Sequence, residues 1–140
     1  MHLYTLLYDA DSFTRMMKYI ILTYTIAIVT YLIWPTCQEL RPKTFTRDNF
    51  LIRFIAGFYQ FDTNTNVCPS IHVIGYLAVM ETGLWCKKLS KSWKVGIIIA
   101  EFLICISTVF MKQHSVLDIL AAVPICILGH ICFFRSSPAK

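Results

Sequence analysis

Four long apolar runs, separated by short polar segments, dominate the chain. They cover residues 16–34, 71–86, 93–111 and 115–134. Each run is close to the ~20 residues that an α-helix needs to cross the hydrocarbon core of a bilayer. Glu81 interrupts the second run, which therefore carries the weakest apolar signal of the four. The pattern predicts four transmembrane helices.

Composition agrees with a membrane protein. Of 140 residues, 56% are hydrophobic and only 15% are charged, a balance too apolar for a soluble domain of this length. The predicted fold is an all-α integral membrane bundle, formed by residues 1–140 as a single domain. The first apolar run is long and no small-residue cleavage site follows it, so it is expected to be a span and not a cleaved signal.

Residues 46–60 carry a different pattern. Phe50, Phe54 and Phe58 recur at helical spacing on one face, and Thr46 is a suitable N-cap. Because the segment is too short to span a bilayer, it is predicted to be an amphipathic helix that lies in the membrane interface.

Basic residues indicate the orientation of the spans. Threading four spans places eight of the 13 lysines and arginines on one side and five on the other. Four of the eight lie in the short loop at residues 87–94, where the positive-inside rule is most reliable. This side is expected to be cytoplasmic, so residues 35–70 and 112–114 are expected to face outward. The eight are Arg15, Lys18, Lys87, Lys88, Lys91, Lys94, Arg135 and Lys140.

The net charge of +5 raises nucleic-acid binding as an alternative. The membrane flanks account for these charges, and no basic stripe with interleaved aromatic residues is present, so no nucleic-acid partner is expected. The six cysteines include no Cys-x-x-Cys pair. A disulfide between Cys37 and Cys68, which share the outward loop, is the less favoured alternative.

Two histidines and a carboxylate stand at the outward ends of the predicted spans. His72 lies in the first turn of the second span, and His114 lies at the start of the fourth, four residues before Asp118. If the last run is helical from its beginning, Asp118 lies on the same face as His114 and can fix the tautomer of the ring. The other polar residues expected at this level are Arg41, Ser70 and Lys112.

This set of side chains suits phosphoryl transfer. Cations neutralise phosphate oxygens, one histidine attacks phosphorus and the other protonates the departing oxygen. Pro69 and Ser70 favour a helix start, where free backbone N–H groups bind phosphate. Three further ionisable residues inside spans are expected to hydrogen-bond between helices instead; they are Glu81, Glu101 and His130.

Three segments resemble the motifs of a known family. Pro69-Ser70-Ile71-His72 resembles the Pro-Ser-Gly-His motif of the type 2 phosphatidic acid phosphatase superfamily, which includes vanadium haloperoxidases and sphingolipid synthases. Residues 107–118 are similar to its third motif, Ser-Arg-x5-His-x3-Asp, with the spacing kept. Arg41-Pro42 is similar to the end of its first motif, Lys-x6-Arg-Pro. The three occur in the family's order, and the resemblance covers residues 16–134.

The resemblance implies a role for each matching residue. His114 would be the nucleophile that forms a phosphohistidine, Asp118 its orienting partner, and His72 the general acid for the leaving group. Arg41 and Ser70 would hold the phosphate. Enzymes of this kind need no metal ion, so neither a metal nor another cofactor is expected.

The chain departs from the family pattern at three motif positions. Trp34 stands at the lysine of the first motif, Ile71 at the glycine of the second and Thr108 at the arginine of the third. Lys112 is the candidate to replace one of the two missing cations. The family core has six membrane helices, so the chain resembles a form without the first two: a truncated product, a fragment, or a small form that completes its bundle as a homo-oligomer.

The expected function is that of an integral-membrane lipid phosphatase, in the cell membrane, that hydrolyses a lipid phosphate monoester or diphosphate at the outward face. The alternatives are a phosphoryl or phospho-alcohol transferase of the sphingolipid-synthase type, and a truncated, inactive membrane module. A serine protease using Ser70 and His114, or a metal site at His72, His114 and Asp118, is less favoured. The expected partners are a lipid phosphate substrate and the bilayer.

Overall fold

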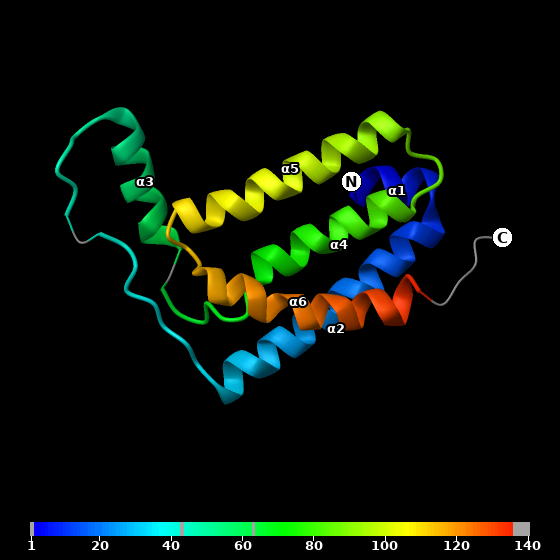
Figure 1. Ribbon diagram of the computed structural model, residues 1–140, viewed down its shortest axis with the longest axis horizontal. Coiled ribbons are helices and arrows are strands. Elements are labelled where there is room, and N and C mark those ends of the chain that lie inside the picture. The colour runs from blue at the N-terminus through cyan, green and yellow to red at the C-terminus, as the bar shows by residue number, and fades with distance from the viewer. Residues whose placement is uncertain (1, 43, 63, 136–140) are drawn as a thin grey trace.

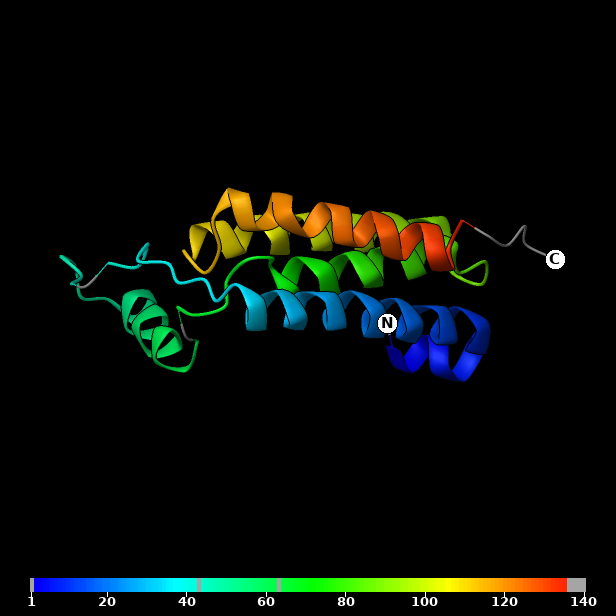
Figure 2. The same cartoon turned by 90° about the horizontal axis from the view of Figure 1, so that it is seen from below.

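The computed structural model describes residues 2–42, 44–62 and 64–135. These residues form six α-helices and no β-strand. Helix α4 packs against α2, α5 and α6, which makes it the centre of the bundle (Figures 1 and 2). The predicted all-α membrane bundle is confirmed. The helices are α1 (His2–Tyr8), α2 (Ala10–Ile33), α3 (Phe50–Phe61), α4 (Ile71–Trp85), α5 (Lys91–Phe110) and α6 (Val116–Phe133).

Three helices, α2, α5 and α6, are long and apolar enough to cross a membrane. Helix α4 is also apolar but has only 15 residues, a length of about 22 Å at 1.5 Å per residue. Its neighbours cover it, since Val73, Ile74 and Ala78 are buried. A helix shielded by protein in this way does not itself have to match the full thickness of the bilayer.

The first span begins earlier than residue 16 because Asp9 caps it. The Asp9 carboxylate accepts hydrogen bonds from the backbone N–H of Ser12 at 3.2 Å and from the Ser12 hydroxyl at 2.8 Å. Helix α2 therefore starts at Ala10, and it ends at Ile33, just before Pro35.

The amphipathic helix begins later than predicted. Asn49, and not Thr46, is the N-cap of α3: its side-chain oxygen accepts from the backbone N–H of Ile52 at 2.9 Å. Asparagine is at least as good an N-cap as threonine, which explains the shift. Helix α3 lies beyond one end of the bundle (Figure 1), and Phe50 and Phe54 are exposed there. This arrangement suits the predicted interfacial position.

The ionisable residues inside the bundle follow the expectations in part. Glu81 on α4 and His130 on α6 form the expected interhelical pair, with Oε2 and Nδ1 3.0 Å apart. Glu101 differs, because its buried Oε2 has no hydrogen-bond partner among the described residues.

Cys37 and Cys68 are both free in the structure. The less favoured alternative, a disulfide between these two residues, is therefore not present.

Helices α2 and α6 come close to each other at Gly129. A Cβ atom there would lie 2.7 Å from the ring of Tyr19, which is fully buried, and 3.0 Å from Thr23. Tyr19 cannot move aside easily, because its ring also packs against Phe134 at a centroid distance of 5.9 Å. Small residues at such contacts let membrane helices approach closely.

We therefore expect Gly129→Ala to destabilise the bundle by about 1–3 kcal/mol, the usual cost of overpacking a tight core. Gly96→Ala is the matched control, because a Cβ at Gly96 on α5 meets nothing within 4 Å and alanine favours the helix. Thermal unfolding in detergent, followed by circular dichroism, measures both variants. Equal melting temperatures for Gly129→Ala and Gly96→Ala would contradict the packing argument.

Candidate active site

The candidate catalytic side chains meet where α4 and α6 begin. His72 lies in the first turn of α4, and His114 directly precedes Ser115, the N-cap of α6. Nδ1 of His72 lies 3.0 Å from Nε2 of His114, and the two ring centroids are 5.2 Å apart. The fold thus brings together two histidines that are 42 residues apart in the chain.

The environment of His114 favours a neutral ring with a lone pair on Nε2. Its Nδ1 lies 2.9 Å from the carbonyl oxygen of Val67. Because a carbonyl can only accept, Nδ1 carries the proton and Nε2 keeps its lone pair, directed at His72. Burial lowers the pKa of His114, and the charge of His72 lowers it further. Both effects favour the neutral ring, which is the form of a histidine that can act as a nucleophile.

Asp118 supports His114 less directly than the sequence suggests. Because His114 lies outside α6, the two residues do not share a continuous helix. Oδ2 of Asp118 lies 3.8 Å from Nδ1 of His114, too far for a hydrogen bond. The same oxygen accepts from the backbone N–H of Ser115 at 2.7 Å, as part of a capping box. The carboxylate can still stabilise an imidazolium by its charge, while Val67 orients the ring.

Sequence reasoning missed a further contact to Asp118. The side-chain amide of Gln38 donates a hydrogen bond to Oδ2 of Asp118. Gln38 comes from the loop after α2, which Thr36 fastens to the chain before α4: the Thr36 hydroxyl accepts from the backbone N–H groups of Val67 and Cys68, both at 3.1 Å. These contacts also hold the Val67 carbonyl in place beside His114.

Arg41 is held in an ion pair with Asp62. Its guanidinium group also lies over the ring of Tyr59, 4.7 Å from the centroid. The Asp62 carboxylate accepts a second hydrogen bond from the amide of Gln113 at 3.1 Å. Asp62 and Gln113, both absent from the predicted site, line the cavity beside His114. Arg41 itself does not line that cavity and contacts it only through its ion pair with Asp62.

The structure does not gather the other two predicted phosphate ligands at the histidine pair. Ser70 is fully buried and caps α4: its hydroxyl accepts from the backbone N–H of Val73 at 3.4 Å. Its own N–H donates to the Asp118 carbonyl at 3.1 Å, which ties the start of α4 to α6. Lys112 is exposed, with a left-handed φ of 49°, and does not line the cavity.

Two motif positions without the family cation lie in contrasting surroundings. Thr108 is buried, and its hydroxyl donates to the carbonyl of Cys105 at 2.8 Å within α5. Trp34 is 73% exposed at the end of α2, where an aromatic side chain suits the membrane interface.

A cavity of about 390 Å³ opens beside the two histidines. This volume suits a small headgroup. Asp62, Asn66 and Gln113 give it a polar wall, and Ile28, Tyr31 and Ile71 give it a more apolar one. The described residues contain no group of three or more histidine, cysteine, aspartate or glutamate side chains placed to hold a metal ion.

A family model supplies the comparison with known proteins. The model of the PAP2 superfamily matches residues 15–140, a stretch that contains α4, α5, α6 and both histidines. Comparison with curated proteins and with solved structures gives no match.

Proposed function

The chain belongs to the PAP2 superfamily, and from this premise we propose that it is an integral-membrane enzyme that removes phosphate from a lipid phosphate ester through a phosphohistidine on His114. Membership supports phosphatase or phosphotransferase chemistry, and three helices are suited to crossing a membrane. The observation that carries the proposal is the histidine pair: a buried ring with its lone pair on Nε2, 3.0 Å from a second imidazole.

In the first proposed step, the substrate phosphate enters between the two rings. Nε2 of His114 attacks phosphorus while the bond from phosphorus to the leaving oxygen breaks, and His72 gives its proton to that oxygen. The imidazolium character that develops on His114 is stabilised by the Val67 carbonyl and by the negative charge of Asp118.

In the second proposed step, water replaces the departed alcohol. His72, now neutral, takes a proton from the water while the water oxygen attacks phosphorus. The bond from phosphorus to Nε2 of His114 breaks at the same time. Inorganic phosphate leaves, and both histidines return to their starting states. An acceptor alcohol in place of water would give the transferase alternative with the same side chains.

The proposed phosphate contacts require a change of partner at Arg41. In the structure its guanidinium pairs with Asp62, so binding exchanges that carboxylate for phosphate oxygens. Lys112, two residues from His114 and exposed, is proposed to supply a second cation by turning its flexible side chain toward the cavity. Ser70 contributes by fixing the start of α4, on which His72 stands.

The position of the cavity supports a lipid substrate. It sits at the end of the bundle at which α4 and α6 begin, and its more apolar wall comes from α2 and α4. The basic loop at residues 87–94 joins α4 to α5 at the opposite end (Figure 1). With that loop in the cytoplasm, we propose that the site opens at the outer surface of the cell membrane.

The rate is expected to depend on pH as a bell-shaped curve. On the acid side, protonation of His114 removes the attacking lone pair. Because burial lowers the pKa of His114, this limb should fall below the ordinary histidine value of about 6.5. On the alkaline side, the leaving group loses its proton donor, His72. Phosphate release measured from about pH 5 to about pH 9 tests this scheme, and a flat profile would contradict it.

Activity on a panel of lipids tests the proposed function. The full chain, purified and reconstituted in vesicles, is given phosphatidate, phosphatidylglycerol phosphate or a polyprenyl diphosphate, with and without an added alcohol. Phosphate release that requires His114 supports the phosphatase. Transfer to the alcohol would identify a transferase, and turnover of no substrate would indicate an inactive module.

A further inference from the structure

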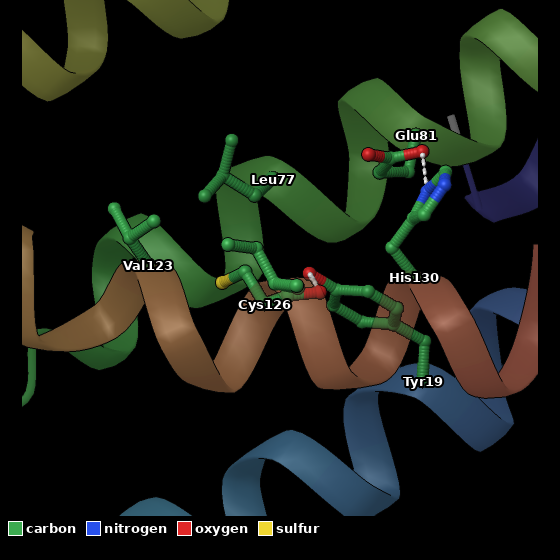
Figure 3. Close-up of a pocket in the computed structure, with 7 residues that line it drawn as sticks. Tyr19, Leu77, Glu81, Val123, Cys126 and His130 are labelled. Atoms are coloured by element: carbon green, nitrogen blue, oxygen red, sulfur yellow. Dashed lines mark hydrogen bonds and ion pairs between the residues drawn. The ribbon is translucent and has the colours of Figure 1, made fainter.

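A second pocket, with mostly apolar walls, lies toward the other end of the bundle, between α2, α4 and α6 (Figure 3). Its volume is about 390 Å³, and it shares no lining residue with the histidine cavity. Glu81 and His130, which are hydrogen-bonded to each other, lie side by side in its lining. The lining residues are Tyr19, Leu77, Glu81, Val123, Cys126, Ile127 and His130.

Glu81 provides this pocket with a hydrogen-bond acceptor. Its Oε2 accepts from Nδ1 of His130 at 3.0 Å. Figure 3 shows the second carboxylate oxygen of Glu81 directed away from His130. The Tyr19 hydroxyl is already committed to the carbonyl of Cys126, at 3.4 Å. A ligand that contacts the second oxygen of Glu81 must therefore supply a hydrogen-bond donor.

The pocket opens on the lateral surface of the bundle, the surface that lipid would cover in a membrane. Val123 and Ile127 on α6 are 39% and 53% exposed, whereas Tyr19 on the inner wall is fully buried. Glu81 lies four residues before the end of α4 and His130 three residues before the end of α6, a depth of about 5–6 Å at 1.5 Å per residue. The polar pair therefore stands near the boundary between acyl chains and headgroups.

We propose that this pocket binds a membrane amphiphile through a headgroup that donates hydrogen bonds, either a hydroxyl or a primary ammonium group. The apolar side chains of Leu77, Val123 and Ile127 would pack against the acyl chain, and the Glu81 carboxylate would accept from the headgroup. The negative charge of Glu81 disfavours a headgroup that offers only phosphate oxygens. The site is separate from the catalytic one and does not depend on the proposed phosphatase activity.

Photo-crosslinking tests the proposal. The full chain is reconstituted in phosphatidylcholine vesicles with a long-chain alcohol that carries a photoreactive diazirine, and labelled peptides from α4 and α6 are identified by mass spectrometry. Unlabelled diacylglycerol and phosphatidylethanolamine, which carry a hydroxyl and a primary ammonium group, should compete for labelling. Added phosphatidylcholine, which has no donor, should not.

Two substitutions at Glu81 test the headgroup contact, and the second distinguishes a hydroxyl from an ammonium group. Glu81→Leu removes one acceptor and should reduce labelling about fivefold, as expected for one lost hydrogen bond. Glu81→Gln keeps a carbonyl acceptor but loses the charge, so it should spare competition by diacylglycerol and weaken competition by phosphatidylethanolamine. If Glu81→Leu fails to fold, Val123→Trp fills the pocket mouth without touching the polar pair and should give the same loss.

Two results would overturn the proposal: equal competition by donor-bearing and donor-free lipids, or labelling of α4 and α6 that survives both Glu81→Leu and Val123→Trp. His114→Ala separates this proposal from the phosphatase. Labelling of the pocket should persist in that variant, so a loss of phosphate release alone leaves the second site intact. Phosphate release without donor-dependent labelling would reject the second site alone.

Discussion

Replacing His114 with alanine is expected to lower kcat by at least about 10⁴-fold, the scale seen when a nucleophile is removed from an active site. The variant lacks the only side-chain nitrogen that the described structure directs at His72 with a lone pair. Phosphate release from the best lipid of the panel measures the loss. A substrate labelled with ³²P should leave wild-type protein labelled after an alkaline quench, which preserves the acid-labile bond from phosphorus to histidine, and the variant unlabelled.

Loss of fold must be distinguished from loss of chemistry in this experiment. His114 is only 5% exposed, so its removal also deletes the contact to Val67. The melting temperature of the variant therefore accompanies the kinetic measurement. Cys132→Ala is a control for handling, because Cys132 is exposed on α6. Folded His114→Ala protein that keeps a tenth or more of the wild-type rate would place the nucleophile elsewhere.

The spans could be predicted from the sequence because lipid imposes a minimum apolar length. The runs assigned to residues 93–111 and 115–134 lie within two residues of α5 and α6 at each end. The errors arose at polar helix starts, where several residues compete as caps. Because Asp9 is the N-cap, α2 starts earlier in the chain than predicted. The N-cap of α3 is Asn49 and not Thr46.

The proximity of His72 and His114 could be predicted because each histidine belongs to a local motif at the same end of the bundle. The relation between His114 and Asp118 could not be read from their spacing alone, because α6 starts after His114. A signal for this was present: Ser115 and Asp118 have the spacing of a capping box, which places the helix start at residue 116. That rule places His114 before the helix and Asp118 inside it, as the structure does.

The remaining contacts depend on the tertiary fold. Gln38 reaches Asp118 across 80 residues, and the Val67 carbonyl reaches His114 across 47. A backbone carbonyl leaves no mark in the sequence, and Gln38 lies in an irregular loop with no pattern of its own. Asp62 has a similar origin, because its link to Arg41 joins the two ends of the segment that carries α3.

These long-range contacts bear on the two missing family cations. With Trp34 exposed and Thr108 turned to its own helix, Arg41 is the family cation that remains, and Asp62 neutralises it in the structure. The charges of Arg41 and Asp62 thus balance each other in the structure. Phosphate binding to Arg41 must break this ion pair. The affinity for phosphate is therefore expected to depend partly on the strength of the ion pair between Arg41 and Asp62.

Replacing His72 with alanine should affect substrates unequally. A lipid phosphate releases a poorly acidic alcohol, so loss of the proton donor is expected to reduce its turnover about 10²–10⁴-fold. p-Nitrophenyl phosphate releases an anion stable enough to depart without a proton. Its first step should therefore remain fast in His72→Ala, because Nε2 of His114 is still oriented through Val67.

The second step should then limit this variant, because His72 is also the proposed base that activates water. Stopped-flow absorbance is expected to show a burst of nitrophenolate, stoichiometric with enzyme, followed by slow turnover. In the double variant His72→Ala/His114→Ala the burst should vanish, since no phosphohistidine can form. An equal loss of rate on both substrates, without a burst, would mean that His72 positions the phosphate and does not transfer the proton.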